Sequence, residues 1–116
     1  MTTDTVAKVA TRTGSSGYTI GGMAKGAGML APGLATMLVV ITTDAKLDQA
    51  TLDQALRAST SQSFDRLDTD GCMSTNDTVI LMSSGAHDAT VDADEFTALL
   101  RDLCLDLMHQ IGRAHV

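Results

Sequence analysis

The pattern of hydrophobic and polar positions predicts short strands in the first third of the chain. Stretches typical of strands, Val6–Ala10 and Tyr18–Ile20, flank a predicted hairpin turn over Gly14–Gly17. Residues 21–36 hold five glycines and one proline, so we expect no long regular element there. Met37–Thr43 is β-branched and mostly apolar, which is typical of a strand that is covered on both faces.

Helical and strand patterns alternate in the rest of the chain. The spacing of Thr51 and Gln54 is that of a capping box, which predicts a helix that begins near Thr51. Thr78–Met82 is a second strand of the buried type, and Ser83–Gly85 is expected to end it. Asp92–Glu95 has the acidic character of a helix start. The apolar stripe of this last helix comprises Phe96, Leu99, Leu100, Leu103 and Leu107.

The order strand, helix, strand, helix over residues 37–108 predicts the fold class. Helices in such an order pack on a sheet. We therefore expect an α/β protein of the layered α+β kind, a mixed sheet with packed helices.

Composition narrows the classes of function. The chain of 116 residues has a net charge of −6 and no basic run, which argues against nucleic acid and anionic membranes as partners. Its longest apolar run, Met37–Ile41, is far shorter than the roughly 20 residues that span a bilayer. The first residues lack a charged and apolar signal-peptide pattern, so a cytoplasmic protein is expected.

No pattern in the sequence predicts a metal site. The three histidines, His87, His109 and His115, have no paired spacing. Asp68–Gly71 is similar to part of a calcium loop, but the first and last ligand positions do not fit, so an acidic turn is favoured. Cys104 lies beside the apolar stripe and is interpreted as a buried structural thiol.

Thr36 is singled out by its position among sixteen threonines. It lies between a Gly/Pro segment and an apolar strand, where a rigid element could hold a hydroxyl beside a deformable peptide. These are conditions for an exposed nucleophile. An ordinary threonine at a strand edge remains the other interpretation, and position alone favours it.

Five motifs in register favour the nucleophile over the ordinary strand-edge threonine as the interpretation of Thr36. In chain order they are Thr2–Thr5, Gly21–Pro32, Ala35–Leu38, Thr42–Ala45 and Ser74–Thr78. In this order they resemble the ornithine acetyltransferase family of arginine biosynthesis, whose members are glutamate N-acetyltransferases. The resemblance runs from residue 1 to about 108 and implies the DmpA-like N-terminal-nucleophile fold.

The resemblance implies a self-cleaving precursor. Cleavage between Ala35 and Thr36 makes residues 1–35 the end of an α chain and 36–110 the start of a β chain. Thr36 then carries acetyl from N-acetylornithine to glutamate, and Lys25, Thr2 and Thr36 contact substrate. No metal or resident cofactor is implied. Acetyl-CoA is a further donor in some members, and the α and β chains are expected to form a heterotetramer.

The chain also departs from the family pattern. Gly33-Leu34 stands where Asn-Met is frequent, and the family's Thr-Gly oxyanion pair lies upstream of Thr2. A substrate-binding Glu lies downstream of residue 108. We therefore expect an internal fragment that is inactive alone. Residues 111–116 match adapter DNA translated in frame, so we expect a non-native tail.

The alternative is a non-catalytic structural or interaction module. In that interpretation Thr36 is a plain strand residue and the chain is a small domain of its own.

Overall fold

The computed structural model describes the backbone of residues 8–31, 34–61 and 78–114, and the side chains of 8–25, 38–61 and 78–110. Its four strands form one sheet in the order β1-β2-β3-β4. The first three strands are antiparallel neighbours, whereas β3 and β4 are parallel and joined through a helix. In chain order the elements are β1 (Lys8–Thr13), β2 (Thr19–Ala31), β3 (Leu34–Ala45), α1 (Gln49–Ser61), β4 (Thr78–His87) and α3 (Ala93–Ala114).

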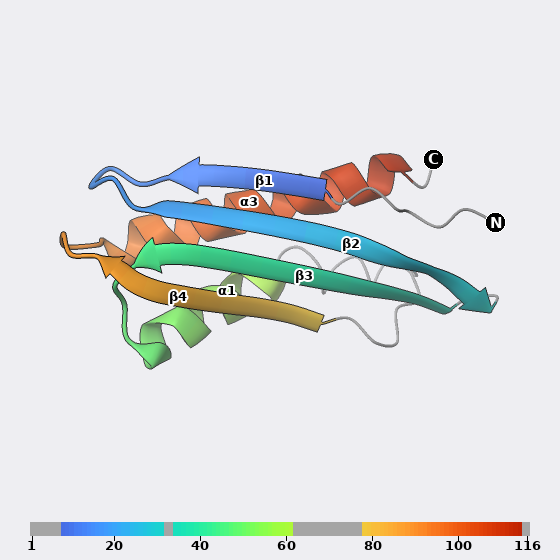
Figure 1. Ribbon diagram of the computed structural model, residues 1–116, viewed down its shortest axis with the longest axis horizontal. Helices are drawn as coiled ribbons and strands as arrows, with labels where there is room; N and C mark the ends of the chain where they lie inside the picture. Colours follow the sequence, from blue (N-terminus) through green and yellow to red (C-terminus); the bar gives the residue numbers. More distant parts are fainter. Residues whose placement is uncertain (1–7, 32–33, 62–77, 115–116) are drawn as a thin grey trace.

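The two helices in the described ranges, α1 and α3, lie on the same face of the sheet (Figure 1). α3 packs under β1 and β2 and also contacts α1, which lies behind β3 and β4. The core fills the space between the two layers, and its fully buried members include Tyr18, Ile20, Ile41, Phe96, Leu100, Leu103 and Leu107. The predicted mixed sheet with packed helices is confirmed. None of the helices in the described ranges is long and apolar enough to cross a membrane.

The expectation that residues 21–36 form no long regular element is wrong. β2 continues through the glycine-rich segment to Ala31, and β3 begins at Leu34. Ladder hydrogen bonds join backbone atoms, so glycines can take part in them. At Gly22 the absent side chain is required, because a Cβ would lie 2.7 Å from Leu103 Cδ2 of α3. Gly22 therefore lets α3 approach the strand closely.

The expectation that β3 and β4 are covered on both faces is also wrong for the described residues. Val39 and Ile41 of β3 are buried under the helices, but Leu38 is 46% exposed on the other face. Ile80 and Met82 of β4 are exposed as well. Nor does Ser83–Gly85 end β4, which continues to His87. We call the side of the sheet opposite the helices the open face.

Aspartates cap both helices. The Asp92 carboxylate accepts a hydrogen bond from the Asp94 amide at 2.9 Å, so the predicted start of the last helix is confirmed. The first helix begins two residues before the predicted Thr51. Its cap is Asp48, whose Oδ1 accepts the Thr51 amide at 2.9 Å. This hydrogen bonding to Thr51 lowers the pKa of Asp48.

The predicted hairpin turn between β1 and β2 is confirmed, and α3 holds it in place. The Gly17 amide donates to the Gly14 carbonyl, and Gly17 has a positive φ of 101°. The Glu95 carboxylate of α3 accepts the Ser15 amide at 3.0 Å and the Tyr18 hydroxyl at 2.8 Å. These bonds, the Ser15 amide first, lower the pKa of Glu95. Burial, followed by the bond to Glu95, raises the pKa of Tyr18.

The edge strand β1 is tied to α3 by charge. The Arg12 guanidinium donates to Asp102 at 2.9 Å and to Asp106 at 3.1 Å. The bond to Asp102 is the main reason that the pKa of Arg12 is raised. Further along α3, the Gln110 amide donates to the Val9 carbonyl.

We predict that Gly14→Ala destabilises the fold. The new Cβ would lie 2.1 Å from the Tyr18 ring, so a fully buried aromatic side chain would have to move. The expected loss in the free energy of unfolding is about 1–3 kcal/mol, measured by urea unfolding. Gly21→Ala is the matched control, because its Cβ would meet Thr42 at an ordinary 3.9 Å. Equal losses in both variants would contradict the packing of the turn.

A second prediction concerns acid pH. A carboxylate with a lowered pKa stabilises the fold above its unfolded pKa, and this contribution is lost as pH falls through the folded pKa. Glu95→Gln keeps an acceptor oxygen but cannot titrate. We expect the free energy of unfolding to fall less steeply from about pH 5 to pH 3 in this variant than in the unchanged chain. Urea unfolding at several pH values measures the slopes, and parallel slopes would refute the role of Glu95.

Candidate active site

The register of β2 with β3 brings two of the predicted site residues together. Lys25 pairs with Leu38, and Ala27 pairs with Thr36. Lys25 and Thr36 are therefore diagonal neighbours of the antiparallel ladder, and such neighbours lie roughly 7–8 Å apart. A lysine side chain can reach across that distance. Lys25 and Thr36 are eleven residues apart in the sequence, but they lie close in space because β2 and β3 are antiparallel.

The ladder breaks at the predicted scissile peptide. Pairing is regular from Ile20↔Thr43 to Ala27↔Thr36 and resumes, shifted, at Ala31↔Leu34. Three residues of β2, Gly28 to Leu30, therefore lie opposite Ala35 alone. Such an irregularity removes backbone groups from the regular ladder, and bulges are enriched next to active sites. The bond between Ala35 and Thr36 lies at its boundary.

A row of three exposed residues crosses the sheet beside this point. Lys25 of β2, Leu38 of β3 and Thr78 of β4 are aligned by the strand registers. All three are exposed, in alternation with buried neighbours such as Ala24 and Val39, so they share the open face. Within the described ranges, Lys25 forms no ion pair. Its ammonium is thus available to an acidic group of a substrate.

The sequence interpretation assigned no chemistry to Leu38 or Thr78. Thr78 is the last residue of a motif, Ser74–Thr78, that carries part of the family resemblance. The motif itself was the available signal. Only the parallel register of β4 with β3 shows that its last residue lies beside Leu38 of β3.

A second pair of reactive residue types lies at the opposite end of the sheet. Ser16 Oγ lies 3.3 Å from His87 Nε2, with the Tyr18 ring at the side of the imidazole. A serine nucleophile needs a histidine that a third group orients. The nearby Glu95 carboxylate is bound by Ser15 and Tyr18 instead. Among the described residues this pair lacks the acid that would make it a triad.

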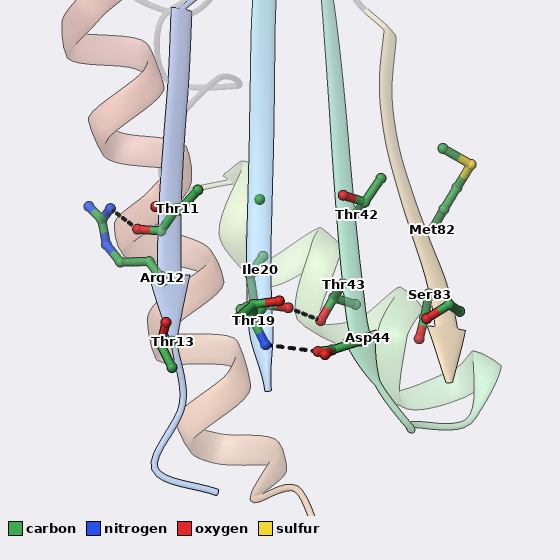
Figure 2. A pocket seen from close by; sticks show the side chains of 12 residues that line it. Thr11, Arg12, Thr13, Thr19, Ile20, Thr42, Thr43, Asp44, Met82 and Ser83 are labelled. Carbon is green, nitrogen blue, oxygen red and sulfur yellow. Dashed lines mark hydrogen bonds between the residues drawn. The ribbon is translucent and has the colours of Figure 1, made fainter. Parts of the chain in front are cut away.

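A shallow groove of about 800 Å³ lies on the open face. Figure 2 shows that strand hydroxyls line it, among them Thr11, Thr13 and Thr42. Its one carboxylate, Asp44, already accepts the Thr19 amide at 2.8 Å. Thr42 lies six residues, or about 20 Å, along β3 from Thr36. The groove is therefore separate from the register break, and it offers no nucleophile with a base.

The other sequence predictions have different outcomes. Cys104 is fully buried, as predicted. Thr2, the Asp68–Gly71 turn and most of Ser74–Thr78 lie outside the described residues. The part of the chain that the structure describes contains no group of three or more His, Cys, Asp or Glu that could hold a metal ion.

Known proteins resemble this chain along nearly its whole length. The arginine biosynthesis bifunctional protein ArgJ of Streptomyces avermitilis is 62% identical over 110 residues, which are 95% of this chain and 28% of the relative. The protein of the same name from Thermobifida fusca is 64% identical with the same coverage. That of Bifidobacterium longum is 55% identical over 96% of this chain. The chain thus spans about 28% of the length of these relatives.

The model of the ArgJ family matches residues 1–114. This match covers nearly the whole sequence and includes both strands of the hairpin that carries Lys25 and Thr36. The chain belongs to the ArgJ family.

Proposed function

We propose that this chain is the central part of a glutamate N-acetyltransferase of arginine biosynthesis. In this proposal the parent protein cuts itself between Ala35 and Thr36 and then uses Thr36 to carry the acetyl group. The observation that carries the proposal is the break in the β2–β3 ladder at Ala35. The relatives are named arginine biosynthesis bifunctional proteins, and this name supports a role in arginine biosynthesis.

The self-cleavage is an N-to-O acyl shift followed by hydrolysis. The Thr36 hydroxyl attacks the Ala35 carbonyl carbon, and its proton passes to the Thr36 nitrogen as the carbon–nitrogen bond breaks. Water then attacks the resulting ester and breaks its carbon–oxygen bond. The products are the Ala35 carboxylate and a Thr36 with a free amine and a free hydroxyl. A carbonyl that is released from regular ladder pairing has more freedom to become tetrahedral.

The new amine of Thr36 supplies the base. An α-amine has an ordinary pKa of about 7.7–8.0, so part of it is neutral near pH 7. It can accept the proton of its own hydroxyl, which is the known pairing of a threonine with an N-terminal amine. This chemistry needs no histidine, which fits the position of His87 at the other end of the sheet.

Acetyl transfer then takes two steps. The Thr36 oxygen attacks the acetyl carbonyl of N-acetylornithine, and ornithine leaves with a proton on its nitrogen. The amine of glutamate next attacks the acetyl-threonine ester, forms N-acetylglutamate and restores the hydroxyl. The two substrates bind in turn, so the kinetics are ping-pong. Lys25 binds the substrate carboxylate by a charge-assisted hydrogen bond.

The whole enzyme needs more than this chain. In the proposal the Thr-Gly oxyanion pair precedes Thr2 and further substrate contacts follow residue 108. Donors to the oxyanion are often the largest catalytic contribution, so the 116 residues are inactive alone. Thr2 contacts substrate, acetyl-CoA is a further donor, and the α and β chains assemble as a heterotetramer in the cytoplasm.

The Thr36 prediction is tested on the full-length parent. We expect its mass spectrum to show two chains, the second of which begins at Thr36. N-acetylornithine without glutamate should add the mass of one acetyl group to that second chain. Thr36→Ala should remain one chain without acetyl, whereas Thr36→Ser should still be cut. A parent that stays intact and never carries acetyl at Thr36 would favour the non-catalytic module instead.

A further prediction concerns Lys25. Lys25→Met keeps the aliphatic stem but removes the charge, and a hydrogen bond to a charged group is worth about 1.5–3 kcal/mol. We expect KM to rise roughly 10- to 100-fold for both substrates, measured by steady-state kinetics of the full-length parent. Lys46→Met, just after the far end of β3, is the control for the lost charge. An unchanged KM in Lys25→Met would remove Lys25 from the site.

A further inference from the structure

The row of Lys25, Leu38 and Thr78 has the right dimensions for an amino acid. Strands lie about 4.8 Å apart, so Lys25 and Thr78, one strand to either side of β3, are roughly 10 Å apart. Leu38 lies between them and is 46% exposed. Position 36 lies two residues before Leu38 on the same strand, and positions two apart on a strand share one face of the sheet. Lys25, Leu38 and Thr78 thus form a line across the sheet, and Thr36 lies beside this line, next to Leu38 along β3.

The α-carbon of the substrate projects three groups that match these positions. Its acetylated nitrogen must lie at Thr36, where the acyl group is transferred. Its carboxylate pairs with Lys25 on the β2 side. The third group, the side chain, then has to extend over Leu38 toward β4. Ornithine and glutamate side chains begin with methylene groups, which suit contact with a leucine.

We propose that Thr78 binds the polar end of the substrate side chain and that Leu38 is the floor beneath its methylenes. This inference rests on the proposed acetyl transfer at Thr36. Thr78 is exposed on the open face, and its hydroxyl has no hydrogen-bond partner among the described residues. A threonine hydroxyl can both donate a hydrogen bond to a ligand and accept one from it.

A hydroxyl at this place fits the two-step reaction. The donor brings an ammonium at the end of its side chain, and the acceptor brings a carboxylate. A charged residue facing the side chain would attract one substrate and repel the other. A threonine hydroxyl accepts a hydrogen bond from an ammonium and donates one to a carboxylate. Thr78 can thus serve both substrates at the same position.

The test compares two donors on the full-length parent. N-acetylnorvaline has the carbon chain of N-acetylornithine without the terminal amine, so it cannot bond to Thr78. We expect Thr78→Val to raise KM for N-acetylornithine and for glutamate by roughly 10-fold with kcat within about 3-fold. The ratio of kcat/KM for N-acetylornithine to that for N-acetylnorvaline should fall by a similar factor. Thr78→Ser, which keeps the hydroxyl, should restore the ratio.

Control and contrary outcomes are distinct. Thr42→Val makes the same change on the same open face, further along β3, and should leave the ratio unchanged. An unchanged ratio in Thr78→Val, or a KM increase for only one of the two substrates, overturns the inference. If Thr78→Val does not fold, as judged by its failure to be cut, Thr78→Ala replaces it in the same comparison. If the unchanged parent is itself neither cut nor acetylated, the proposed function fails first.

Discussion

The register between β2 and β3 is the constraint on which the candidate site depends. It is fixed at the helix-covered end of the hairpin, where Ile20, Ala24 and Ile41 are fully buried. A slip by one residue would turn these side chains to the open face, which makes the register costly to change. Because the ladder is regular up to Ala27↔Thr36, the core fixes the position of Thr36 relative to Lys25. The ladder breaks only beyond that pair.

The open face shows how much this chain leaves uncovered. A second row, formed by Val9, Met23, Val40 and Ile80, crosses all four strands, and Val9 is 62% exposed. Large contiguous apolar patches are uncommon on free surfaces. At this row the strands are apolar on both faces, which suits two covering layers, and the described residues supply one. The row with Lys25 and Thr78 lies directly next to this apolar row, so the candidate site borders a surface that is suited to burial.

Patterns that are local in the sequence predicted local structure well. The cap at Asp92, the stripe from Phe96 to Leu107 and the turn at Gly14–Gly17 are all present. Each depends on residues close in the chain, where capping and periodicity act. The glycine-rich residues 21–36 were misjudged because their strand is stabilised by partners elsewhere, namely β3 and the close approach of α3 at Gly22. Propensity cannot report such partners.

For the candidate site too, the sequence predicted some residues but not the long-range arrangement that brings them together. Resemblance singled out Thr36 and Lys25, and the structure adds their diagonal relation and the ladder break. Thr78 could not be placed, because it is 42 residues from Thr36 in the sequence and its proximity arises only from the parallel register through α1. Parallel pairing always requires such a crossover, so the two residues meet only when the sheet is complete.

In the proposed function the nucleophile carries its own base, so a strand can position it without a histidine from another element. A serine or threonine that relies on histidine needs an imidazole held by a third group, usually from another element. In the proposed function the base is the amine on the same residue, and the described part of the chain adds substrate contacts from single side chains of β2, β3 and β4. Strand positions are held by the ladder on either side, so they are more precise than loop positions. The break beside Ala35 interrupts the β2–β3 ladder, and in the proposed function it lies at the bond that is cut.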